Sequence, residues 1–204
     1  MSNGERQGIP GAAGMPDGLV RLLLDRYRQP HRRYHDDHHL AAVLAAVELL
    51  REHASDLEAV RLAAWFHDAA YDPKRDDNEE VSAQLAEGLL PMFDIPEPRV
   101  TQVARLVRLT AGHTPDEGDA DGEVLCDADL SVLAGDADAY ADYAAGVRTE
   151  FSFVADADFA LARAAVLNGL LARPRIFRTA TGYERWETKA RGNIALELAL
   201  LRTL

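Results

Sequence analysis

A histidine and an aspartate stand next to each other at the end of an apolar helical stretch, as His67 and Asp68. Val60, Ala64 and His67 are spaced i, i+4 and i+7, so His67 continues the face that should turn toward the core. Burying an imidazole beside a carboxylate is costly unless both groups find partners, and a divalent cation can satisfy both. A core histidine satisfied by its neighbour is the alternative interpretation.

Two further segments turn metal-capable side chains toward the core in the same way. His39 shares a helical face with the apolar residues Val43 and Val47. Asp129 follows Leu125 at i+4, which places its carboxylate on an apolar face. Three separate helices are therefore expected to bring imidazole or carboxylate groups inward.

Capping and breaking signals define the helices that must position these groups. The predicted helices cover 18–29, a segment that follows a cap at Asp36 or Asp37, a segment from a cap at Ser55 or Asp56 to Asp68, and then 79–92, 100–111, 125–133, 136–151, 155–172 and 183–201. Met92 is expected on the inner face of the helix 79–92.

Length and composition predict one all-α domain over residues 19–204. The chain of 204 residues is long enough for one sizeable core and short for two. Apolar residues make up 48%, with many Ala and Leu and few β-branched clusters, which favours helices over sheet. Residues 1–18 are rich in Gly and Pro and are expected to form a disordered leader.

The charge and the cysteine content exclude several functions. The balance of 34 acidic against 22 basic residues gives a net charge of −12, so nucleic acid is not an expected partner. A small phosphorylated ligand is still compatible with a few local Arg and Lys. The single Cys126 excludes an intramolecular disulfide and a Cys-rich zinc site. No apolar run reaches the length of a membrane span and no signal peptide is evident, so a cytoplasmic protein that binds no membrane is expected.

The order of His39, then His67 with Asp68, then Asp129 resembles the His…His-Asp…Asp signature of the HD superfamily of metal-dependent phosphohydrolases. Other motifs are similar to those of a small bacterial subgroup of predicted HD phosphohydrolases. They are Arg33-Tyr34-His35-Asp36, Phe66-His67-Asp68 with Tyr71-Asp72-Pro73, Asn78-Glu79-Glu80, Gly112-His113, Asp127-Ala128-Asp129-Leu130, Arg148-x-Glu150-Phe151 and Lys189-Ala190-Arg191-x-Asn193. The chain departs from the subgroup at Asp36, where Asn is usual, and at Phe151, where Tyr is usual.

The resemblance implies an HD-domain helical bundle that holds one divalent metal ion through four ligands, His39, His67, Asp68 and Asp129. Imidazole and carboxylate ligands suit Mn²⁺, Fe²⁺, Co²⁺, Ni²⁺, Zn²⁺ or Mg²⁺, so the identity of the metal stays open. The implied activity is hydrolysis of a small phosphorylated substrate, a nucleotide or another phosphate monoester, by metal-activated water.

Candidate residues for orienting the attacking water are Asp68, Glu79 and Glu80. The two glutamates lie in the first turn of a predicted helix, where they are also ordinary partners of the helix dipole.

Candidate ligands for phosphate oxygens are Arg33, Lys74 and Arg148. For Arg148, an ion pair with a core carboxylate is an alternative.

Two other functions stay open. An HD-fold di-iron oxygenase would hold two metals with the help of extra histidines, for which His35 and His113 are the candidates. A non-catalytic protein that senses a nucleotide would keep the pocket and bind without turnover. A homodimer is compatible with a helical chain of this size, although no residue points to one.

Overall fold

The computed structural model describes residues 15–202, and every regular element in this range is helical. The α-helices are α2 (Asp17–Tyr27), α3 (Asp37–Leu50), α4 (Leu57–Phe66), α5 (Asn78–Leu89), α6 (Glu97–Leu109), α7 (Ala120–Leu130), α8 (Ala137–Glu150), α9 (Asp156–Leu171) and α10 (Ala180–Leu201), and the short 3₁₀ helices are η1 (Arg51–His53), η2 (Leu90–Phe93) and η3 (Ser131–Ala134). The all-α prediction is confirmed for this range. None of these helices combines the length and the apolar character needed to cross a membrane.

The beginning of α2 bears on the predicted leader. Residues 1–14 of that segment lie outside the described residues. Helix α2 begins at Asp17, and Met15 before it packs against the core. The first helix therefore starts ahead of position 19, where the sequence places the domain boundary.

Two of the predicted N-caps position the helices that carry the histidines. The carboxylate of Asp36 accepts hydrogen bonds from the backbone N–H groups of His38 and His39, and so begins α3. Asp56 accepts one from Ala59 and begins α4. Because each cap satisfies otherwise unpaired N–H groups, it determines which residue enters the first turn.

The predicted helix 79–92 ends earlier than expected. Helix α5 stops at Leu89, and the 3₁₀ turn η2 with Pro91 follows it. Proline has no N–H to donate within a helix, and a 3₁₀ turn advances side chains by a different angle from an α-helix. Met92 therefore leaves the inner face and is 74% exposed, so its predicted burial was wrong.

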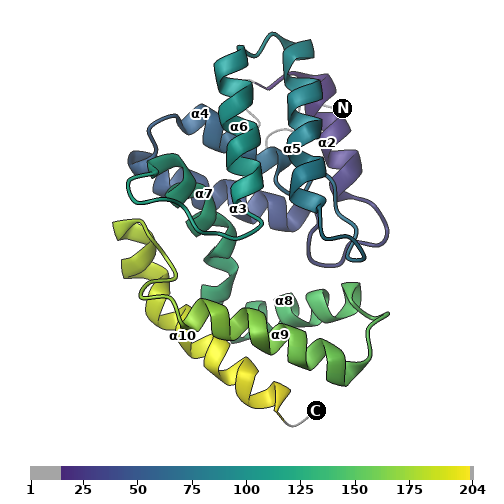
Figure 1. Ribbon diagram of the computed structural model, residues 1–204, viewed down its shortest axis with the longest axis vertical. Coiled ribbons are helices and arrows are strands. Elements are labelled where there is room, and N and C mark those ends of the chain that lie inside the picture. Colours follow the sequence, from purple (N-terminus) through teal and green to yellow (C-terminus); the bar gives the residue numbers. More distant parts are fainter. Residues whose placement is uncertain (1–14, 203–204) are drawn as a thin grey trace.

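The buried apolar side chains form two clusters. The larger lies among α2 to α7, with Tyr27, Trp65 and Phe66 at its centre. The smaller is built from η3 and the last three helices, and Trp186 packs against both. Figure 1 shows α8, α9 and α10 as a separate layer beneath the bundle of α2 to α7, joined to it through the end of α7.

Asp127 connects α7 to the start of α10. One carboxylate oxygen accepts the N–H of Arg178 at 2.8 Å, and the other accepts the N–H and the hydroxyl of Thr179 at 2.8 and 2.7 Å. Thr179 in turn caps α10 through the N–H of Gly182. A Cβ on Gly182 would lie 2.5 Å from Asp127 Oδ2, so this approach requires glycine. Asp127 is thus a structural carboxylate that ties the two layers together.

Candidate metal centre

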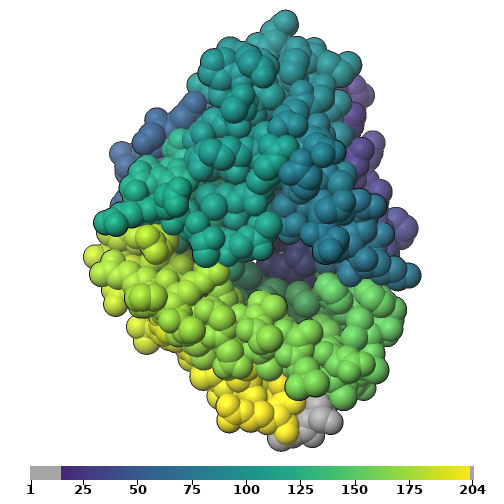
Figure 2. Space-filling model, in the orientation of Figure 1, coloured from purple at the N-terminus to yellow at the C-terminus, as the bar shows by residue number. Residues whose placement is uncertain are grey.

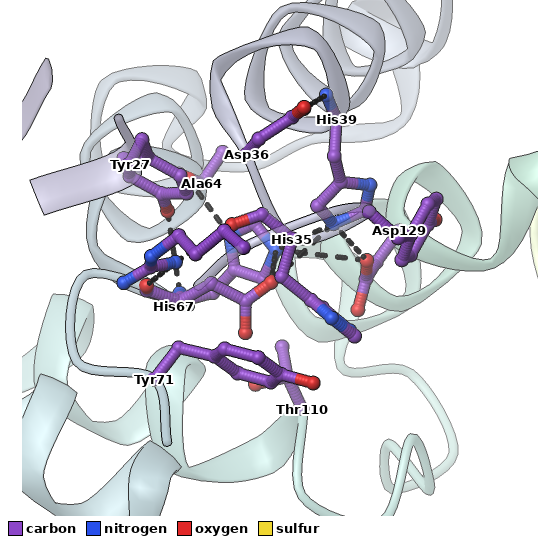
Figure 3. A network of polar contacts seen from close by, with 12 residues as sticks. Tyr27, His35, Asp36, His39, Ala64, His67, Tyr71, Thr110 and Asp129 are labelled. Atoms are coloured by element: carbon purple, nitrogen blue, oxygen red, sulfur yellow. Dashed lines mark hydrogen bonds and ion pairs between the residues drawn. The ribbon is translucent and has the colours of Figure 1, made fainter. Parts of the chain in front are cut away.

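Three helices direct polar side chains to one buried point, as the sequence predicts. His39 comes from the first turns of α3, His67 from the residue after α4, and Asp129 from the end of α7. The two histidines are only 6% and 1% exposed. Figure 3 shows His39, His67 and Asp129 turned toward one another.

The facing atoms lie at the distances expected of ligands that share one ion. His39 Nε2 is 3.1 Å from His67 Nε2 and 3.2 Å from Asp129 Oδ1, and His67 Nε2 is 3.6 Å from the same oxygen. Ligands about 2.1 Å from a metal and about 90–109° apart stand about 3.0–3.4 Å from each other. Donor atoms of all three side chains lie within 4.8 Å of one another, so these residues are able to hold a metal ion.

Asp68 adjoins this group from the side of the histidines. Its Oδ2 lies 3.1 Å from His67 Nε2 and 3.4 Å from His39 Nε2. It does not belong to the set of mutually close donor atoms that His39, His67 and Asp129 form. The structure thus brings all four predicted ligands together, with Asp68 at the edge of the group.

A hydrogen bond determines which nitrogen of His67 faces the cluster. Its Nδ1 lies 2.8 Å from the carbonyl oxygen of Ala64, within the last turn of α4. A carbonyl only accepts hydrogen bonds, so Nδ1 carries the proton and donates it. In the neutral imidazole Nε2 therefore presents its lone pair to the cluster, which is the tautomer that a metal ligand needs.

The electrostatics of the cluster are those of a site that attracts cations. Burial alone would lower the pKa of His67, but the neighbouring carboxylates of Asp68 and Asp129 outweigh it and hold that pKa well above its usual value. Burial raises the pKa of Asp68 and Asp129, but nearby imidazoles, His67 foremost, hold both well below the usual range. Two ionised carboxylates thus favour a positive charge between them, carried by a proton or by a metal ion.

His113 contacts the side of the Asp129 carboxylate that faces away from His39. Its Nε2 lies 2.7 Å from Asp129 Oδ2, the oxygen that does not face His39. Arg173 donates to the carbonyls of Gly112 and His113, and so holds the turn that carries the imidazole. Hydrogen bonds of this kind orient a ligand and typically affect metal affinity strongly.

The variant His113→Asn is expected to lower the affinity for Mn²⁺ by about 10- to 100-fold without unfolding the protein. Asparagine is chosen because His113 has φ of 47°, which asparagine adopts more readily than most residues, and because its shorter side chain leaves Asp129 unsupported. Calorimetric titration with Mn²⁺ measures the effect. His53→Asn, which removes a histidine bonded to Thr181, is the matched control, and equal affinity in the two variants would rule out the supporting role.

Glu150 holds the loop that precedes α3 beside the cluster. One of its oxygens accepts the N–H groups of Arg33, Tyr34 and His35 at 2.7, 2.9 and 3.1 Å. The other lies 2.7 Å from His35 Nδ1 and accepts the hydroxyl of Tyr71 at 2.7 Å. The rings of His35 and Tyr71 stack with centroids 4.2 Å apart. This buried carboxylate therefore fixes the position of His35.

Arg32 is a site residue that the sequence did not reveal. Its guanidinium is buried and donates to the carbonyls of His35, Asp68 and Ala69, so it joins the loop before α3 to the turn after α4. Its neighbour Arg33 is exposed and donates to the carbonyl oxygens of Pro30 and Arg32. Two adjacent arginines look alike in sequence, and only the packing shows which one is buried.

Glu79 and Glu80, the candidates for orienting the attacking water, lie on α5. Glu80 is bound by Arg108 at 2.6 and 2.9 Å, and Gln84 donates to it at 2.9 Å. Glu79 is partly exposed in the first turn, and neither glutamate belongs to the converging donor group.

The three predicted phosphate ligands are not together. Arg33 and Lys74 line one pocket, of about 500 Å³, which Asp129 does not reach. Arg148 binds the exposed carboxylate of Asp156 and the carbonyls of Phe151 and Val154. It therefore closes the turn between α8 and α9, and its partner is not a core carboxylate.

Comparison of the chain with models of known protein families, with curated proteins and with solved structures finds no match. The class of the protein is accordingly defined by its fold and its site. It is an all-helical protein, within residues 15–202, with a buried His39, His67 and Asp129 group that could hold a metal ion.

Proposed function

We propose that the chain is an HD-type metal-dependent phosphohydrolase that acts on a small phosphorylated molecule, a nucleotide or another phosphate monoester. The observation that carries the proposal is the convergence of His39, His67 and Asp129, with Asp68 beside them. These residues follow one another along the chain in the order of the HD signature. A metal ion held by these residues would lie beside a cavity that Asp129 also lines. The presence of such a cavity supports a role in chemistry over a purely structural one.

The donor set fits a divalent ion of borderline to hard character. Imidazole nitrogens and carboxylate oxygens together suit Mn²⁺, Fe²⁺, Co²⁺, Ni²⁺, Zn²⁺ or Mg²⁺. The two Nε2 atoms stand 3.1 Å apart in a buried place, so a proton or a cation must lie between them. His39, His67 and Asp129 would hold the ion, and Asp68 would complete the set.

When bound, such an ion lowers the pKa of a water molecule and polarises a phosphoryl oxygen. Asp68 is the residue proposed to orient the attacking water, because its carboxylate adjoins both imidazoles. Glu80 has no role in this proposal, since Arg108 occupies its carboxylate. Glu79 has no role in this proposal either, because it does not belong to the group of converging donor atoms.

His35 is proposed to protonate the leaving oxygen. It lines the same cavity as Asp129, and its ring centroid lies 5.8 Å from that of His39. Glu150 Oε2 accepts a hydrogen bond from Nδ1, which orients the ring and leaves Nε2 for the substrate.

The variant His35→Gln is expected to lower kcat by about 100-fold while KM changes little, because a general acid acts mainly in the transition state. Its metal content should equal that of the unaltered protein. Steady-state kinetics and elemental analysis measure the two effects. Loss of metal in this variant would instead make His35 a ligand, as the two-metal alternative requires, and an unchanged kcat would remove the acid from the mechanism.

Release of inorganic phosphate tests the proposed function. The full chain, loaded in turn with Mn²⁺, Co²⁺ and Ni²⁺, is incubated with a panel of phosphate monoesters that includes nucleoside monophosphates. Phosphate release that is lost in His67→Ala supports the proposal. Oxygen uptake by protein holding two irons would favour the oxygenase, and stabilisation by a nucleotide without turnover would favour a sensing protein.

A further inference from the structure

We propose that the cavity beside the metal centre binds an apolar, ring-sized part of the substrate, so that the preferred phosphate esters are those of hydrophobic alcohols. This inference rests on the proposed function and specifies its substrate class. Of the four proposed metal ligands, only Asp129 lines this cavity.

The cavity joins the metal centre to the layer of α8 and α9. Its volume is about 590 Å³, within the range of small-molecule sites. Asp129, His35, His113 and Tyr34 line one end, and η3, α8 and α9 supply the other walls. Figure 2 shows the surface hollowed between the teal part of the chain and the green part that α8 and α9 form.

The walls away from the metal centre are mostly apolar. Six of the side chains that form them are Val132, Leu133, Val147, Phe151, Phe159 and Leu170. Aromatic and branched side chains of this kind gain free energy by covering an apolar ligand, roughly in proportion to the area removed from water.

The two arginines that line the cavity are already engaged. Arg163 binds Glu197 at 2.8 and 3.1 Å and donates to the hydroxyl of Tyr143 at 2.8 Å. Arg173 donates to the carbonyls of Gly112 and His113. A substrate with several hydroxyl groups would lose water against these walls without gaining equivalent hydrogen bonds, which is costly. The walls therefore favour an apolar group over a sugar.

A glycine on α9, Gly169, leaves open space at the wall of the cavity. A Cβ built on Gly169, which lines the cavity, meets no atom within 4 Å. A leucine at this position therefore begins in open space at the cavity wall and should narrow the cavity, and leucine is a stronger helix former than glycine. Gly88 on α5 is equally free of neighbours and is not among the residues that line the cavity, so it provides a matched control.

The test compares three probes by calorimetric titration of the Mn²⁺-loaded full chain: 1-naphthylmethylphosphonate, methylphosphonate and 1-naphthalenemethanol. None of them is hydrolysed, so binding is measured apart from activity. The naphthyl phosphonate is expected to bind at least about tenfold more tightly than methylphosphonate. Gly169→Leu should remove this preference, whereas Gly88→Leu should keep it, with thermal melts confirming that both variants fold.

The three probes distinguish failure of the inference from failure of the function on which it rests. Equal affinity for the two phosphonates, or a preference that survives in Gly169→Leu, would overturn the apolar cavity alone, whereas absence of binding by all three probes would count against both. Binding of 1-naphthalenemethanol as tightly as the naphthyl phosphonate, lost in Gly169→Leu, would support the apolar cavity while counting against phosphate recognition at the metal. Phosphate release from naphthyl phosphate but not from glycerol phosphate would support both.

Discussion

Replacement of His67 with alanine is expected to reduce the affinity for a divalent ion by more than about 100-fold and to abolish phosphate release. His67 is 1% exposed and contributes the Nε2 atom that stands nearest to both His39 Nε2 and Asp68 Oδ2. Its loss removes one of the three donor atoms that converge in this group, and the two that remain come from separate helices.

The measurement is elemental analysis of protein purified without added metal, compared with His67→Ala and Asp68→Ala. We expect about one ion per chain in the unaltered protein, the stoichiometry that a single set of ligands gives. His53→Ala removes a histidine that is bonded to Thr181 and belongs to no group of converging donor atoms, so it should leave the metal content unchanged. Retention of the ion in His67→Ala, or no ion after reconstitution with Mn²⁺, Co²⁺ or Ni²⁺, would contradict the metal centre.

A second readout does not depend on activity. An ion that binds only the folded state stabilises it by about 2.7 kcal/mol when its concentration is 100 times Kd. The melting temperature of the unaltered protein should therefore rise when Mn²⁺ is added, and that of His67→Ala should not. Chelation should reverse the rise.

The second large effect is expected from Glu150→Gln, which should lower the free energy of unfolding by about 3 kcal/mol at pH 7. Glu150 is 5% exposed and accepts five hydrogen bonds, from three backbone N–H groups, His35 and Tyr71. Burial alone would raise its pKa, but the hydrogen bond and charge of His35 and the backbone N–H groups lower it to about 2. Glutamine would replace one accepting oxygen with an NH2 group, which cannot accept a hydrogen bond from any of these donors.

The pH dependence follows from the sign of this shift. The pKa of a glutamate in the unfolded chain is about 4.3, so the folded state holds Glu150 ionised over a wider range. Its contribution to stability is complete above that value and is lost as the pH falls toward the folded pKa of about 2. Urea unfolding at several pH values should show the difference between Glu150→Gln and the unaltered protein shrinking between about pH 4 and pH 2.

A matched control is Glu80→Gln, which weakens a surface ion pair with Arg108. Exposed pairs of this kind contribute about 0–1 kcal/mol, so this variant should change stability little. If Glu150→Gln behaves like Glu80→Gln, Glu150 does not organise the loop that carries His35.

The inward faces of the helices were predictable because helical periodicity is local. The spacing of Val60, Ala64 and His67 predicts the burial of His67, and the structure confirms it. Asp36 was recognisable as a cap because capping depends on residues within one turn. The same reasoning was wrong for Met92, because Pro91 ends the α-helical register before it.

The partners of these groups were not predictable, since they lie far apart in the chain. Glu150 bonds to residues 115 to 117 positions away, and Arg32 joins segments 36 positions apart. Which of two adjacent arginines is buried, and which carboxylate supports a loop, depends on how helices pack.

The sequence by itself determined the helical class, the inward direction of His39, His67 and Asp129, and the caps that place them, because these properties arise from neighbours along the chain. Only the tertiary structure decided that these three side chains meet and that a cavity lies beside them. It also decided that His113 forms a hydrogen bond with Asp129 and that Glu80 is bound by Arg108. These features depend on the angles at which helices cross and on the volumes that their side chains fill, and packing of the whole chain sets both.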